Sequence, residues 1–204
     1  MKNYFPVPLH DFNVSADTEF LQEINKYLLE KASENIPMDD YSIRGQKSYH
    51  SDANLTRLDT EWSHKLRSLI ATSTQEYWNN SGNLFQAPPE HLMKIACWGM
   101  VMPKGGFSHT HNHPGADVCG VMWTQIPTDL GKREDAEVDE GRFVMLDPVY
   151  ARRVHTSLKP NIDVHPQNGI GLVFPPWLEH FVEPHYSDEI RISLAWNVSF
   201  VGQP

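Results

Sequence analysis

The hydrophobic pattern of the sequence changes near residue 90, and this change limits the folds open to the chain. Before it, the stretches 16–32 and 61–78 repeat large apolar side chains at helical spacing, which predicts two amphipathic helices. After it, short runs rich in valine, isoleucine, phenylalanine and tryptophan are separated by proline, glycine, asparagine and aspartate. Such runs predict antiparallel strands in a sandwich or barrel. Helices that precede the strands could cover one face of a sheet.

The predicted strands are 93–102, 117–126, 142–146, 169–174 and 190–200. The polar stretch 35–58 predicts an irregular connection between the helices, and the acidic stretch 129–141 predicts either a solvated loop or a lid over a site. With 204 residues the chain fits one domain. We expect residues 1–90 to form a helical part that packs on the sheet, and residues 91–204 to form a mainly β core.

Composition narrows the expected partners and location. The formal net charge is −9 and the isoelectric point is about 5.6, whereas binding to nucleic acid without sequence preference needs a basic surface. No stretch approaches the roughly 20 apolar residues of a membrane-spanning helix, and the N-terminus lacks the apolar run of a signal peptide. We therefore expect a cytoplasmic protein without nucleic-acid or membrane partners. Cys97 and Cys119 are expected to be buried free thiols.

A histidine cluster is the first candidate for chemistry. His109, His111 and His113 alternate along the chain, and alternate residues of an extended strand point to one face. Three imidazoles on one face suit iron, copper, nickel or zinc. The alternatives are a solvated histidine run, or a single histidine that is hydrogen-bonded in the core.

A second candidate lies near the C-terminus. His180 is surrounded by apolar residues, so its ring is expected to face a dry interior, where it is either hydrogen-bonded or bound to a ligand. Arg191 and Ser193 share one strand face, opposite Ile192 and Leu194. A buried arginine needs an anion, and its planar fork fits a carboxylate. The alternatives for Arg191 are a pair with an internal acid and exposure on an edge strand.

His180, ten intervening residues, and then Arg191-Ile192-Ser193 resemble the signature of the iron(II)/2-oxoglutarate oxygenases. This resemblance implies a double-stranded β-helix (jelly-roll) core with Fe(II) and 2-oxoglutarate as cofactors. It also implies that His180 is an iron ligand, that Arg191 binds the far carboxylate of 2-oxoglutarate, and that Ser193 assists it.

Most of the chain also resembles a bacterial and phage group within that superfamily. The resemblance rests on Phe5-Pro6-Val7-Pro8, on His111-Asn112-His113-Pro114 and on Phe174-Pro175-Pro176-Trp177-Leu178-Glu179-His180. It implies a dioxygenase that hydroxylates an amino acid, a peptide or a small metabolite and releases succinate and carbon dioxide. Members of such folds often pair, so a homodimer is also expected.

The sequence departs from the superfamily at one ligand. The usual pattern has an aspartate or glutamate two residues after the first histidine, and neither His109 nor His111 is followed by one. His113 can replace the carboxylate, Asp117 can supply it from the following turn, or only two histidines bind the metal. The preferred set is His111, His113 and His180, with His109 and Asp117 as alternatives. Halogenases of the superfamily also lack the carboxylate, although a small residue replaces it there.

Three further residues are candidates for a substrate pocket: Asn112, Trp123 and Gln125. A tryptophan in a strand is more often part of the core. A cupin-type metal-binding barrel that does not use 2-oxoglutarate is a competing interpretation. It would not require Arg191 and Ser193 at this distance from His180. An interaction module with incidental histidines would bind no metal.

Overall fold

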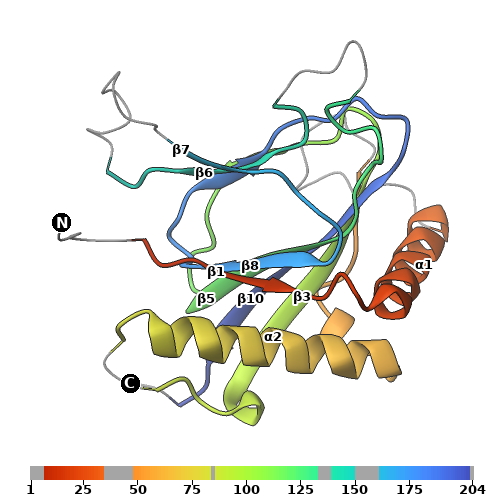
Figure 1. The fold of residues 1–204 in the computed structure, drawn as a ribbon. Coiled ribbons are helices and arrows are strands. Elements are labelled where there is room, and N and C mark those ends of the chain that lie inside the picture. Colours follow the sequence, from red (N-terminus) through yellow and green to blue (C-terminus); the bar gives the residue numbers. More distant parts are fainter. Residues whose placement is uncertain (1–6, 35–47, 84–85, 133–138, 150–160, 203–204) are drawn as a thin grey trace.

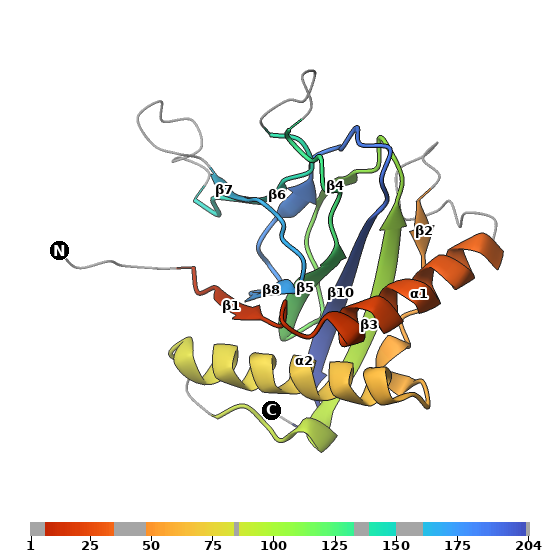
Figure 2. The same ribbon diagram turned by 45° about the vertical axis from the view of Figure 1, so that its right-hand side comes forward.

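The computed structural model describes residues 7–34, 48–83, 86–132, 139–149 and 161–202. In these residues a six-stranded and a four-stranded sheet face each other, and two long helices cover the outer face of the larger sheet (Figures 1 and 2). All strand pairs within the two sheets are antiparallel. The prediction of a mainly β fold with N-terminal helices is confirmed.

The larger sheet has the order β1 (His10–Asn13), β8 (Ile170–Phe174), β5 (Val118–Gln125), β10 (Arg191–Phe200), β3 (Met93–Met102) and β2 (Tyr49–His50). The smaller sheet has the order β4 (Ser108–His111), β9 (His180–Val182), β6 (Phe143–Leu146) and β7 (Asn161–Val164). The long helices are α1 (Thr18–Glu34) and α2 (Glu61–Asn80), and short 3-10 helices lie at Leu55–Arg57 and Glu90–Leu92.

Both long helices begin at a side-chain cap. The Asp17 carboxylate accepts the Phe20 N–H at 3.3 Å, and the Thr60 hydroxyl accepts the Ser63 N–H at 3.3 Å. Their apolar stripes are buried against the larger sheet at Phe20, Leu21, Ile24, Leu28, Trp62, Leu66, Ile70 and Tyr77. The predicted helices agree with the structure to within two residues at each end.

The larger sheet separates the interior into two cores, and the two faces of its strand β10 contribute to one core each. Ile192, Leu194 and alternate residues after them face the helices and belong to an outer core between helices and sheet. Arg191 and Ser193 lie on the opposite face, toward the inner core between the two sheets. This inner core contains Cys119, Val121, Trp123, Phe143, Met145, Leu172, Phe174, Leu178 and Val182. The predicted alternation along this strand is confirmed.

Two glycines let aromatic rings lie on the backbone of the larger sheet. A Cβ atom at Gly120 would overlap the ring of Trp196, and one at Gly171 would overlap the ring of Phe12. The two rings lie 6.2 Å apart, centroid to centroid. Neither glycine has a positive φ, so these positions require space: for the Phe12 ring at Gly171, and for both the Trp196 ring and the Leu172 carbonyl oxygen at Gly120.

The N-terminal part is not purely helical, which corrects the prediction for residues 1–90. It contributes β1 and β2, which occupy the two edges of the larger sheet. Each is at most four residues long, too short to show a clear alternation. Within the predicted loops, residues 35–47 and 133–138 lie outside the described residues. Among the described helices, none is long and apolar enough to cross a membrane.

Candidate metal centre

Three histidines meet at the edge of the smaller sheet that β4 and β9 form. His111 ends β4, His113 lies in the turn after it, and His180 begins β9. Pairing of β4 with β9 places His111 directly opposite His180. One ring nitrogen of each histidine lies within 4.8 Å of the others, and the Nε2 atoms of His113 and His180 are 3.3 Å apart. This group, which we call the histidine triad, contains no carboxylate among the described residues.

Backbone carbonyls orient two of the rings. His111 Nδ1 lies 2.7 Å from the carbonyl oxygen of His109, and His180 Nδ1 lies 2.8 Å from that of Leu178. A carbonyl can only accept a hydrogen bond, so each Nδ1 carries the proton. The lone pair of each ring is therefore on Nε2, the nitrogen available to a metal.

Burial keeps two of the imidazoles neutral. His180 is only 3% exposed, and the rings of Phe143 and Phe174 lie 5.2 and 5.0 Å from its ring. Burial, followed by the nearby charge of His111, lowers the pKa of His180 to about 3 and that of His113 to about 4. Both rings are therefore neutral at neutral pH, with a lone pair on one ring nitrogen, which is the form that binds metals.

The two alternative ligands lie outside the triad. His109 is exposed, with its ring 5.2 Å from that of Phe107. The Asp117 carboxylate accepts the N–H of Phe200 at 2.7 Å. Strand β4 ends at His111, and its pairing with β9 shifts register before that residue. His109, His111 and His113 therefore do not all point to one face of a strand, contrary to what their alternation in the sequence predicts.

The inner face of β10 holds a buried cation. Arg191 is 1% exposed and Ser193 is 2% exposed. Arg191 Nη1 donates to the carbonyl oxygen of Gly141 at 2.8 Å, while its Nε–H has no hydrogen-bond partner among the described residues. No described carboxylate forms an ion pair with the guanidinium, and burial lowers the pKa of Arg191 to about 10. Because β10 is a central strand, the structure supports neither an internal acid partner nor an exposed edge position.

A second donor faces the same space. Trp123 lies opposite Ser193 in the pairing of β5 with β10 and is fully buried. Its indole N–H finds no acceptor within the part of the chain that the structure describes. Buried donors are normally satisfied. Two unsatisfied donors at neighbouring positions therefore fit an anionic group such as the far carboxylate of 2-oxoglutarate, and the triad fits a divalent metal.

The other pocket candidates have simpler surroundings. The Gln125 amide is half-buried and donates to the carbonyl oxygen of Ile190 at 2.8 Å. Asn112 is exposed, beside the triad in sequence. A role for these residues and for Trp123 in a substrate pocket stays a prediction.

Two residues near the site were not singled out from the sequence. Burial, and then the charge of His111, lower the pKa of His50 on β2, so this fourth histidine lies close to the triad. Its position in a polar stretch gave no signal of a strand. Gly141 contributes only its carbonyl group to Arg191, and a backbone contact of this kind leaves no trace in a sequence.

A family model described as "Putative 2OG-Fe(II) oxygenase" matches residues 96–197, which is half of the chain. The match includes His111, His113, His180, Arg191 and Ser193. It supports the oxygenase interpretation over that of a cupin without 2-oxoglutarate. None of the curated proteins matches the chain.

Solved structures of low sequence identity share the fold. A Pseudomonas putida prolyl-4-hydroxylase is 15% identical, with 96% of this chain and 94% of that chain covered and a TM-score of 0.63. A Trichoplax adhaerens prolyl hydroxylase, in complex with a hypoxia-inducible-factor peptide fragment, is 13% identical, with coverages of 95% and 84% and a TM-score of 0.65. HygX from Streptomyces hygroscopicus, with nickel and 2-oxoglutarate bound, is 10% identical, with coverages of 96% and 84% and a TM-score of 0.61.

The fold, the family match and the site lead to one conclusion. The predicted jelly-roll core is confirmed, and the family match extends from β3 through most of β10. The chain belongs to the 2OG-Fe(II) oxygenases, which use Fe(II) and 2-oxoglutarate.

Proposed function

We propose that this oxygenase hydroxylates a small molecule or a peptide, with Fe(II) held by His111, His113 and His180. Arg191 and Ser193 would bind the far carboxylate of 2-oxoglutarate. The observation that carries the proposal is the buried guanidinium of Arg191, which has no described carboxylate partner and lies within the same jelly roll as the triad. Bound iron and 2-oxoglutarate would supply an oxidation that consumes dioxygen and releases succinate and carbon dioxide.

The side chains of the site would bind and orient the reactants. The protonated Nδ1 atoms of His111 and His180 fix both rings, so that Nε2 of each is free for the metal. Phe143 and Phe174 exclude water from one side of His180. The Trp123 N–H, opposite Ser193, offers a further donor to the same carboxylate.

His113 would occupy the ligand position that a carboxylate usually fills. Three neutral imidazoles carry one negative charge less than the usual set, so we expect Fe(II) to be retained less strongly. The variant His113→Asp should bind Fe(II) more tightly than the wild type, and His113→Ala more weakly. If His113→Ala binds Fe(II) as tightly as the wild type, only two histidines serve as ligands.

The whole chain is proposed to form a single oxygenase domain. Side chains of α1 and α2 share the outer core with side chains of β3, β5 and β10, and β1 and β2 extend the same sheet. Hydroxylation as the reaction is supported by the fold shared with two prolyl hydroxylases, one of which is bound to a peptide.

The test is thermal unfolding in the absence of oxygen, with Mn(II) or Fe(II), with and without 2-oxoglutarate. A ligand at 100 times its dissociation constant stabilises the folded state by about 2.7 kcal/mol. We expect metal and 2-oxoglutarate each to stabilise the wild type, and Arg191→Ala to lose only the 2-oxoglutarate part. Arg67→Ala, which removes the ion pair between Arg67 on α2 and Glu90, is the control and should keep both stabilising effects.

If 2-oxoglutarate stabilises Arg191→Ala as much as the wild type, the proposed role of Arg191 is wrong. If metal and 2-oxoglutarate both stabilise the wild type, succinate release should be followed with candidate prolyl peptides, amino acids and metabolites. A product that gains one oxygen atom would establish hydroxylation, whereas a product isomeric with its substrate would overturn it.

A further inference from the structure

The buried Arg191 side chain depends on one backbone carbonyl for its position. Among the described residues its only hydrogen-bond partner is the Gly141 carbonyl oxygen, at 2.8 Å. Gly141 lies in the turn before β6 with a φ of 67°, a left-handed conformation that favours glycine. Whatever holds this turn in place therefore also sets the direction of the guanidinium.

Backbone hydrogen bonds connect this turn to the segment after β9. The Gly141 N–H donates to the Pro184 carbonyl oxygen at 3.0 Å, and the Glu183 N–H donates to the Arg142 carbonyl oxygen at 2.9 Å. The buried Glu140 carboxylate accepts the Tyr186 N–H at 3.1 Å. The two segments thus hold each other on both sides of Gly141.

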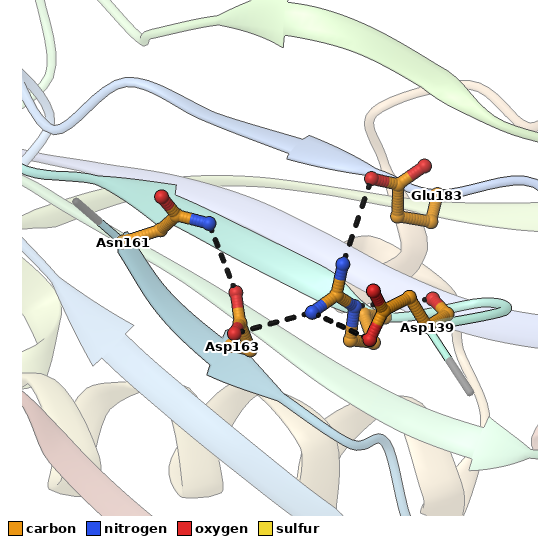
Figure 3. A network of polar contacts seen from close by, with 5 residues as sticks. Asp139, Asn161, Asp163 and Glu183 are labelled. Atoms are coloured by element: carbon orange, nitrogen blue, oxygen red, sulfur yellow. Dashed lines mark hydrogen bonds and ion pairs between the residues drawn. The ribbon is translucent and has the colours of Figure 1, made fainter. Parts of the chain in front are cut away.

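The side chain of Arg142 strengthens this connection. Its Nη1 lies 2.9 Å from an Asp139 oxygen and 3.1 Å from an Asp163 oxygen, and its Nη2 lies 3.9 Å from a Glu183 oxygen. Its Nε donates to the Asp139 carbonyl oxygen at 3.1 Å. Figure 3 shows these carboxylates around the central guanidinium, with Asn161 bonded to Asp163. One cation therefore ties the turn, β7 and the end of β9 together.

This network lies on the opposite face of the smaller sheet from the inner core. Phe143, which follows Arg142, points into the inner core, and neighbouring side chains of a strand point to opposite faces. Asp163 pairs with Val144 rather than with Phe143, so it shares the outer face. Arg142 therefore touches neither the triad nor the space beside Arg191, and can affect them only through the backbone of the turn.

We propose that Arg142 is a positioning residue that sets the affinity for 2-oxoglutarate. It holds the Gly141 carbonyl in place, and this carbonyl orients the Arg191 guanidinium toward the co-substrate. The inference rests on the proposed function, because it requires Arg191 to bind 2-oxoglutarate. Without Arg142, the carboxylates of Asp139, Asp163 and Glu183 would repel one another. The turn would then separate from β7 and from the segment after β9. The Gly141 carbonyl would no longer be fixed, and Arg191 would adopt several orientations.

The experiment compares Arg142→Met, Arg142→Lys and Arg67→Met with the wild type. Mn(II) binding to the metal-free protein, and then 2-oxoglutarate binding to the Mn(II) protein, are measured by calorimetry without oxygen. We expect Arg142→Met to weaken 2-oxoglutarate binding by about tenfold and to leave Mn(II) binding unchanged. Arg142→Lys keeps the charge and should recover part of the affinity, and Arg67→Met should behave as the wild type.

A double-mutant cycle separates positioning from general loosening. In the Arg191→Lys background the shorter, unforked side chain no longer uses the Gly141 carbonyl in the same way, so Arg142→Met should then change 2-oxoglutarate affinity less than about twofold. An equal loss in both backgrounds, or a parallel loss of Mn(II) affinity, would overturn the inference. If Arg191→Lys itself leaves 2-oxoglutarate affinity unchanged, the proposed role of Arg191 fails instead.

Asp163→Asn provides a milder variant in case Arg142→Met does not fold. It preserves the shape of the side chain and removes one charge from the network, so we expect a loss of about threefold in 2-oxoglutarate affinity. Wild-type affinity in Asp163→Asn, together with wild-type affinity in either Arg142 variant, would contradict the inference.

Discussion

The two faces of β10 differ in chemistry: one is apolar and the other carries a charge. Toward the helices, Ile192 and Leu194 lie fully buried in the outer core. Toward the smaller sheet, the same strand presents Arg191 and Ser193. The Nε–H of Arg191 and the indole N–H of Trp123, on the adjacent β5, find no acceptor among the described residues. The apolar face contributes free energy of folding, whereas the polar face costs some and is left ready for a ligand.

This difference teaches that alternation along one strand can separate stability from chemistry. Residues one position apart point to opposite faces, so a change on one face should leave the other nearly untouched. The predictions below test how complete that separation is, beginning with the largest expected effect.

Truncation on the helix side should affect folding alone. Leu194→Ala removes a fully buried side chain from the outer core, and we expect a loss of about 3 kcal/mol in the free energy of unfolding. Urea unfolding measures this loss, and the folded variant should bind 2-oxoglutarate with wild-type affinity. A tenfold weaker affinity in the folded variant would show that the two faces are coupled.

Removal of the cation on the inner side should do the reverse. Arg191→Met replaces a buried charge, which has no ion pair with any described carboxylate, with an apolar side chain, so the ligand-free protein should be as stable as the wild type or more stable by about 1 kcal/mol. The stabilisation of about 2.7 kcal/mol by 2-oxoglutarate at 100 times its wild-type dissociation constant should disappear. Unfolding with and without the co-substrate measures both quantities. A large loss of ligand-free stability would mean that Arg191 holds the fold together.

Acid should destabilise the metal-free protein through the triad. The pKa values of His180 and His113 are lowered to about 3 and about 4 by burial, below the value of about 6.5 in an unfolded chain. Between pH 6.5 and pH 4 the unfolded state binds more protons, so stability falls as the pH falls, by at most about 1.4 kcal/mol per pH unit for each histidine. Urea unfolding at several pH values measures this slope.

The matched variant for that measurement is His113→Gln. It cannot take up a proton, so its stability should depend less steeply on pH than that of the wild type. Identical slopes in the two proteins would place the acid sensitivity elsewhere in the chain.

The smallest effect is expected outside the triad. His109→Ala removes an exposed ring, and Asp117→Asn weakens the acceptor of the Phe200 N–H. Both should keep wild-type metal affinity, and Asp117→Asn should lose less than about 1 kcal/mol of stability. His111→Ala is the comparison, because it should lose metal binding. Calorimetric titration with Mn(II) decides among them, and weaker binding in Asp117→Asn would return that carboxylate to the ligand set.

Long periodic elements of the fold were predictable from the sequence. The predicted strand 93–102 coincides with β3, and the predicted strand 190–200 differs from β10 by one residue. Both strands run through the middle of the larger sheet, where each apolar residue faces a core. In contrast, β1, β2 and β7 are short and lie at sheet edges. The positions of β1 and β2 follow from pairing with β8 and β3, which are distant in the sequence, and no local pattern records such pairing.

The site was predictable where spacing carries chemistry. The ten residues between His180 and Arg191 comprise the rest of β9 and the connection to β10, and this spacing identified both residues. That His111 and His113, rather than His109, approach His180 depends on where β4 ends and on its register shift. Those features belong to the three-dimensional pairing, as does the carbonyl of Gly141 that holds Arg191.

The aromatic rings over Gly120 and Gly171 have a consequence for how this sequence can change. A side chain at either glycine needs space that an aromatic ring fills, and at Gly120 it would also lie 2.7 Å from the Leu172 carbonyl oxygen. The clearer case is Gly171, where an alanine can be accommodated only if position 12 becomes smaller. The glycine and its ring therefore behave as one unit of substitution: either change alone leaves an overlap or a void, and the sheet can be rebuilt only in paired steps.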